Sequence, residues 1–104
     1  MPHVTVKGLS EDNVREMAED LKKLIVEASG TNEEYVKIFY SPIKRVDGPL
    51  EASVDVYWMH RPQEICDRTA EALTNYLKEK GHSFVQVTFT EFPGNLFYEN
   101  NVHY

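Results

Sequence analysis

Apolar residues recur along the chain with two different periods, and each period predicts one kind of element. Strict alternation of valines with polar residues predicts a strand at residues 3–7. A helix is expected next, between an N-cap at Ser10 and a helix-ending Gly30, because one face of it is apolar. The β-branched and aromatic run 35–40 predicts a second strand. The members of the apolar helix face are Val14, Met17, Leu21, Leu24, Ile25 and Ala28.

The second half of the chain repeats this order. Residues 53–59 alternate strictly and give the strongest strand signal of the chain. Pro62 suits the first turn of a second amphipathic helix, which is expected to end at Gly81. Residues 85–90 alternate again, while residues 41–51 contain proline and glycine without apolar periodicity and are predicted to form a loop. The chain therefore contains the order β-α-β twice.

The two helices have the length of right-handed crossovers between parallel strands. Two such units side by side predict an α+β fold: one four-stranded mixed sheet with both helices on one face, in a single domain spanning residues 1–104. A ferredoxin-like arrangement shares this element order, but it usually joins the middle strands by a tight hairpin. The long loop 41–51 and a strand that starts at Pro2 favour two βαβ units related by a pseudo-two-fold axis.

Composition and charge exclude several classes of function. The chain has 11 Lys and Arg against 17 Asp and Glu, a formal net charge of −6 at pH 7. Nucleic acids and anionic membranes bind basic surfaces, so we expect neither as a partner. No stretch approaches the roughly 20 apolar residues of a membrane span, and no secretory signal is recognisable. The single cysteine, Cys66, suits a reducing compartment, so we expect a cytoplasmic protein.

The surfaces left open by the helices predict self-association. The uncovered sheet face is expected to carry four large aromatic side chains: Tyr35, Phe39, Tyr57 and Phe84. The C-terminal segment is also too apolar for a free end, through Phe92, Leu96, Phe97, Tyr98, Val102 and Tyr104. A lone domain of this size rarely exposes so much apolar surface, and we therefore expect a homo-oligomer.

Metal and phosphate chemistry lack a recognisable motif. The four histidines, His3, His60, His82 and His103, are scattered and form no helical pair, so no metal site is expected. The chain has no glycine-rich phosphate loop. Cys66 has no readable histidine partner and is interpreted as structural.

The chain resembles the tautomerase superfamily, which includes 4-oxalocrotonate tautomerase (4-OT) and macrophage migration inhibitory factor. The resemblance rests on a Met-Pro start that runs straight into a strand, the two βαβ halves and the tail after the fourth strand. It is greatest with an uncharacterised bacterial group of no established activity. That group shares Met1-Pro2-His3, the pattern Asp55-Val56-x-Trp58-x-x-Arg61-x-Gln63, and the closing Tyr98, His103 and aromatic Tyr104.

This resemblance implies a symmetric trimer with the helices outside and the tail extending the sheet of a neighbour. It also implies cofactor-free keto–enol chemistry on a small 2-oxo acid. The base would be Pro2, whose secondary amine is freed when Met1 is removed. Such an amine can take a proton from carbon if desolvation and a nearby cation lower its pKa from the α-amino value of about 8.

Partners for this proline follow from the pseudo-two-fold, which places the start of the first strand near the end of the third. Arg61 would then bind a substrate carboxylate or steady an enolate oxygen. His60 and Tyr98 are candidates for assisting proton transfer. Trp58 is a candidate ligand wall or a core residue, and His3 either tunes the amine or belongs to an interface.

A non-catalytic interpretation stays open from the same residues. Thr31 stands where the cytokine branch has a lysine, and Val85 and Val87 lie near the place of a polar pair in that branch. If Met1 is retained, Pro2 is a tertiary amide and cannot act as a base. The alternative is a trimeric module that binds a small ligand or a protein on the same scaffold.

Overall fold

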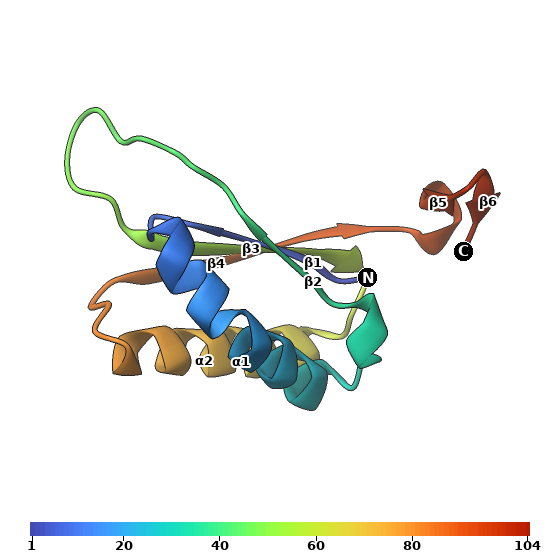
Figure 1. The fold of residues 1–104 in the computed structure, drawn as a ribbon. Coiled ribbons are helices and arrows are strands. Elements are labelled where there is room, and N and C mark those ends of the chain that lie inside the picture. Colours follow the sequence, from blue (N-terminus) through green and yellow to red (C-terminus); the bar gives the residue numbers. More distant parts are fainter.

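A computed structural model describes residues 1–104 and shows one mixed sheet with both helices packed against the same face (Figure 1). In chain order the elements are β1 (His3–Lys7), α1 (Glu11–Ser29), the 3-10 helix η1 (Glu33–Tyr35), β2 (Lys37–Tyr40), β3 (Ala52–Met59), α2 (Gln63–Glu79), β4 (Val85–Phe92), the 3-10 helix η2 (Gly94–Leu96), β5 (Tyr98–Glu99) and β6 (Val102–His103).

The strand order is β2-β1-β3-β4. Strand β1 runs parallel to β2 and antiparallel to β3, and β3 runs parallel to β4. Each parallel pair encloses one helix, and the antiparallel pair at the centre, with Val4 opposite Val56, relates the two βαβ units. The predicted α+β fold is confirmed.

Local sequence explains where the helices begin and end. The Ser10 side chain accepts a hydrogen bond from the backbone N–H of Asn13 at 3.2 Å and caps α1. Gly30 ends α1 at a φ of 75°, and its N–H donates to the carbonyl of Val26. Helix α2 starts after Pro62 without any side-chain cap of its own. The backbone carbonyl of Pro62 accepts the N–H groups of Ile65 and Cys66 in its first turn at 3.0 and 3.3 Å.

The core lies between the helices and the inner face of the sheet. Valines of β1 and β3 alternate inward and pack against the apolar helix faces that the sequence predicts. The buried cluster consists of Val4, Val6, Val14, Met17, Leu21, Ile25, Val36, Val54, Val56, Trp58, Cys66, Leu73 and Leu77. Neither helix combines the length and the apolar composition needed to cross a membrane.

The start of one strand differs from the sequence prediction, and neither Tyr35 nor Phe84, both expected on the open sheet face, lies within a strand. Strand β2 begins at Lys37, because residues 33–35 form η1, where the Asn32 side chain accepts from the N–H of Glu34. Tyr35 thus lies before the sheet edge. Phe84 likewise precedes β4.

The open sheet face still carries an aromatic cluster, which continues into the tail. The ring centroids of Tyr57 and Phe92 are 4.7 Å apart, and those of Phe92 and Phe97 are 5.3 Å apart. The ring centroid of His3 lies 5.5 Å from that of Phe39 and 6.3 Å from that of Phe97. Beyond this cluster the β5–β6 hairpin stands past the end of β4, on the same side of the molecule as the N-terminus (Figure 1).

Candidate functional site

The first two residues are buried at the end of the central strand pair. Met1 is 5% exposed, and the Pro2 side chain is fully buried. The hydroxyl of Thr31 donates to the Met1 carbonyl at 3.3 Å, and the N–H of Lys37 donates to the Pro2 carbonyl at 3.1 Å. The chain start is therefore fixed by the turn after α1 and by β2.

The amino group at this chain start lies in an unusual electrostatic environment. Burial lowers the pKa of the Met1 α-amino group below its usual 8.0. Glu99 opposes this shift, whereas the positive charges of Arg61 and Lys37 reinforce it. Burial and the same N-terminal and Lys37 charges lower the pKa of His3. The site thus disfavours added positive charge, as a neutral amine base requires.

Arg61 is held by backbone and aromatic groups rather than by an acid. Its Nη1 donates to the carbonyl of Met59 at 2.8 Å, with a longer contact of 3.4 Å to that of His60. Its guanidinium carbon lies 4.9 Å from the ring centre of Trp58. None of the ion pairs in the structure includes Arg61. Its remaining N–H groups are free to bind a carboxylate.

A carboxylate from β4 organises the turn that carries Arg61. Glu91 Oε2 accepts from the Arg61 backbone N–H at 2.9 Å, and Glu91 Oε1 lies 3.1 Å from His60 Nδ1. The Cys66 thiol donates to Glu91 Oε2 at 3.9 Å. The Arg61 bond, followed by that to His60, keeps the pKa of Glu91 below its usual value. Burial and Glu91 raise the pKa of the Cys66 thiol, so it is not an activated nucleophile.

The tail closes one side of the chain start. A hollow of about 330 Å³ is lined by Met1, His3, Glu34, Tyr35, Lys37, Phe97, Glu99 and Tyr104. The Tyr104 hydroxyl donates to the Glu99 carboxylate, which raises the pKa of Tyr104 to about 12. The Tyr104 N–H also donates to the Phe97 carbonyl at 3.1 Å. Aromatic, cationic and acidic groups therefore meet beside the N-terminus.

The structure brings some of the predicted site residues together and separates others. His3 lines the hollow at the chain start, whereas Arg61 does not line it and acts on the N-terminal amino group through its charge. His60 lies in the same turn as Arg61 but faces Glu91. Tyr98 is paired with His103 on the tail hairpin and does not line the hollow of its own chain.

Trp58 does not form a ligand wall. Its side chain has no exposed surface and stacks on Phe89 with ring centroids 5.1 Å apart. Of the two interpretations that the sequence leaves open for Trp58, the structure places this residue in the core, because the indole lies on the face of the sheet that the helices cover. Its Nε1 is the one buried side-chain nitrogen or oxygen without a hydrogen-bond partner. Trp58 instead provides the surface over which the Arg61 guanidinium lies.

Three residues of the site could not be recognised from the sequence. Lys37 reaches the chain start because β2 pairs it with His3 in parallel register. Glu91 reaches Arg61 because β3 and β4 pair Trp58 with Glu91. Tyr104 joins them only through the fold of the tail. Lys37 and Glu91 depend on long-range strand pairing, and Tyr104 depends on contacts within the tail. The alternation of β4, followed as far as residue 92, offered a signal for Glu91.

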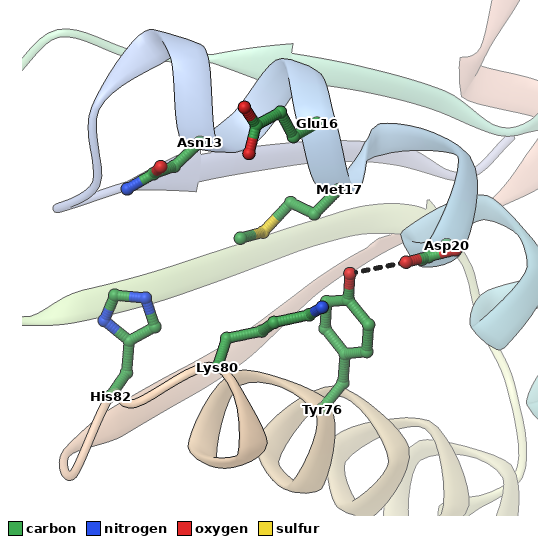
Figure 2. Close-up of a pocket in the computed structure, with 7 residues that line it drawn as sticks. All are labelled: Asn13, Glu16, Met17, Asp20, Tyr76, Lys80 and His82. Atoms are coloured by element: carbon green, nitrogen blue, oxygen red, sulfur yellow. Dashed lines mark hydrogen bonds between the residues drawn. The ribbon is translucent and has the colours of Figure 1, made fainter.

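A second hollow, of about 160 Å³, lies between the two helices and serves their packing (Figure 2). There the Tyr76 hydroxyl on α2 donates to Asp20 on α1 at 2.8 Å, and Lys80 lies over the Tyr76 ring (Figure 2). Burial and the Asp20 bond raise the pKa of Tyr76 to about 12. No group of three or more His, Cys, Asp or Glu side chains in the structure is placed to hold a metal ion.

Comparison of the sequence with protein families gives one match. The model of a family described as a domain of unknown function, DUF1904, matches residues 1–103. Among the curated proteins, none matches this sequence.

Comparison of the structure with solved structures gives matches over nearly the whole chain. A DUF1904 domain from Sebaldella termitidis ATCC 33386 has 24% sequence identity and a TM-score of 0.88, with 100% of both chains covered. Pt0534 inactivated by 2-oxo-3-pentynoate has 18% identity and a TM-score of 0.79, covering 94% of this chain and 91% of its own. The asymmetric trimer of a fused 4-OT, R7, has 15% identity and a TM-score of 0.81, covering 97% and 94%. At these identities the likeness concerns the fold.

Proposed function

This chain belongs to the DUF1904 family and has the tautomerase-superfamily fold, and from this premise we propose that it is a cofactor-free keto–enol isomerase of a small 2-oxo acid. The observation that carries the proposal is the environment of the N-terminal amine. Burial and the charges of Arg61 and Lys37 lower the pKa of the Met1 α-amino group, and neither cation has a carboxylate partner. Removal of Met1 would leave the Pro2 amine beside the same two cations, which would favour the neutral form that proton transfer next to an anionic substrate requires.

The proposed step needs only groups of the chain. After removal of Met1, the lone pair of the Pro2 nitrogen takes a proton from carbon 3 of the 2-oxo acid. The electron pair of that C–H bond forms the C2–C3 double bond, and the C2 carbonyl electrons move to oxygen. The Pro2 ammonium then gives this proton to the enolate oxygen, which yields the enol and restores the neutral amine, and the reverse sequence regenerates the ketone. Arg61 binds the substrate carboxylate or the developing oxyanion, which lowers the barrier electrostatically.

The proposed functional unit is a homotrimer. The open sheet face carries aromatic groups, including the half-exposed Phe39 and Tyr57, which a neighbouring sheet would cover. The superfamily resemblance suggests three copies. In such an assembly the helices stay outside and the chain starts lie at the contacts between subunits.

One observation favours a second candidate, a binding module without catalysis. With Met1 in place the residue is almost fully buried and its carbonyl is hydrogen-bonded by Thr31. In that form the Pro2 nitrogen is a tertiary amide without a basic lone pair. A chain that keeps Met1 would therefore bind ligands in the adjoining hollow without isomerising them.

The two candidates separate in one experiment on the purified protein. Intact mass shows whether Met1 is present, and proton NMR in D₂O follows exchange of the carbon-3 protons of 2-oxobutyrate. The isomerase proposal expects the Met1-free protein to accelerate exchange, and it expects Pro2→Ala to reduce the rate at least about 100-fold. Equal rates for wild type and Pro2→Ala would contradict it.

A further inference from the structure

The turn between β3 and α2 places Arg61 beside the chain start, but no part of that turn is itself a regular element. Residues 60–62 lie between the last residue of β3 and the first residue of α2. Helix α2 also lacks a side-chain cap from its own N-terminal residues. The position of the Arg61 guanidinium therefore depends on contacts made across the fold.

Glu91 supplies those contacts from the neighbouring strand. One carboxylate oxygen accepts from the Arg61 backbone N–H at 2.9 Å, and the other lies 3.1 Å from His60 Nδ1. Its side chain is 29% exposed, so water competes only in part for these bonds. Strand register pairs Glu91 with Trp58, three residues before Arg61. Both carboxylate oxygens of Glu91 contact the turn, and Glu91 forms no ion pair with the Arg61 guanidinium.

The side chain of Arg61 completes this arrangement. Its Nη1 is bound by the Met59 carbonyl at 2.8 Å, and its guanidinium lies over the buried indole of Trp58. These two contacts hold the guanidinium only if the backbone at residue 61 is fixed, because a shift of that backbone would move the guanidinium away from the Met59 carbonyl and from the Trp58 ring.

We propose that Glu91 is a positioning residue, which fixes the backbone at Arg61 and thereby keeps its guanidinium free and directed to an anion at the N-terminus. The consequence for ligand binding rests on the role of Arg61 in the proposed function. The fixation of Arg61 itself does not, so the two parts can be tested separately.

The test uses the full-length protein and two measurements. Nitrogen-15 relaxation of the Arg61 Nε–Hε group reports its mobility, and a titration with pyruvate reports affinity for a simple 2-oxo carboxylate. Glu91→Ala removes both acceptors, and Glu91→Met does so while keeping most of the volume, should the alanine variant fail to fold. Glu91→Gln retains an amide oxygen that can accept from the Arg61 N–H. Glu64→Ala is the matched control, an exposed acid of the first turn of α2 without these contacts.

We expect Glu91→Ala or Glu91→Met to mobilise the Arg61 side chain and to weaken pyruvate binding about tenfold. Glu91→Gln should recover part of both, and Glu64→Ala should change neither. Unchanged Arg61 mobility in the folded Glu91 variants would overturn the proposal, and increased mobility without loss of pyruvate affinity would overturn its consequence for ligand binding. Failure of the isomerase proposal would give a different result. Pro2→Ala would then exchange the carbon-3 protons of 2-oxobutyrate as fast as wild type, while the Glu91 variants would still show increased Arg61 mobility.

Discussion

At the scale of single residues, the site depends on charged groups whose partners are fixed by strand pairing. Arg61 could be singled out from the sequence because it follows the strongest strand and begins the second helix. The two other charged residues could not, because they are separated from Arg61 by 24 and 30 positions. Sheet register brings Lys37 beside His3 at the chain start and brings Glu91 to the turn that carries Arg61. For Trp58 the sequence left two interpretations open, a ligand wall or a core residue, and its alternation with Val54 and Val56 agrees with the buried position in the structure.

The charge of Glu91 makes a testable contribution to stability. Its pKa in the folded protein is lowered, chiefly by the Arg61 N–H bond, from an ordinary value of 4.5. The ionised form is thus favoured by folding, so the contribution is fully present above pH 4.5 and is lost as the pH falls through the folded pKa. Urea unfolding of wild type and Glu91→Gln should show a difference at pH 7 that shrinks below pH 4.5. A difference that is constant with pH would contradict this account.

At the scale of elements, the sequence predicted the helices and the central strands well, because their periodicity and caps are local. It extended the second strand too far, because a capped 3-10 turn at η1 interrupts it and has no periodic signature. The tail hairpin was also not recognisable. It turns at two asparagines, Asn100 and Asn101, with φ values of 49° and 68°.

Two glycines at positive φ differ in what surrounds them. An alanine Cβ at Gly8 would lie 2.0 Å from the Glu51 carbonyl oxygen, whereas Gly30 has nothing within 4 Å. Gly30→Ala should therefore lose about 1 kcal/mol of unfolding free energy through backbone strain alone. Gly8→Ala should lose clearly more, because the strands must separate there. Equal losses in urea unfolding would contradict the close approach of β1 to β3.

The helix pair is joined by one hydrogen bond between side chains. Tyr76→Phe removes the bond to Asp20, and we expect a loss of about 0.5–1.5 kcal/mol in unfolding free energy. Tyr98→Phe is the matched control, since the structure shows no hydrogen bond from its hydroxyl and 56% of the residue is exposed. Similar losses of unfolding free energy in the two variants would show that the Tyr76–Asp20 hydrogen bond does not stabilise the helix pair.

At the scale of the whole molecule, the open sheet face and the tail predict assembly. Sedimentation should give a mass of three times 12.1 kDa. Tyr57→Lys, on the open face, should shift the protein toward monomers without unfolding it, because a buried lysine at an interface is strongly disfavoured. Val46→Lys, in the loop that stands away from the sheet, should leave the trimer intact (Figure 1). A monomeric wild type would contradict the proposed assembly.

The central claim is that a freed Pro2 amine is the base. The most direct measurement compares the Met1-containing and Met1-free forms of the same chain, each verified by intact mass, in the exchange of 2-oxobutyrate carbon-3 protons for deuterium. The account predicts exchange with the Met1-free form and only the background rate with the Met1-containing form. Equal rates for the two forms, or no acceleration by the Met1-free form, would contradict it.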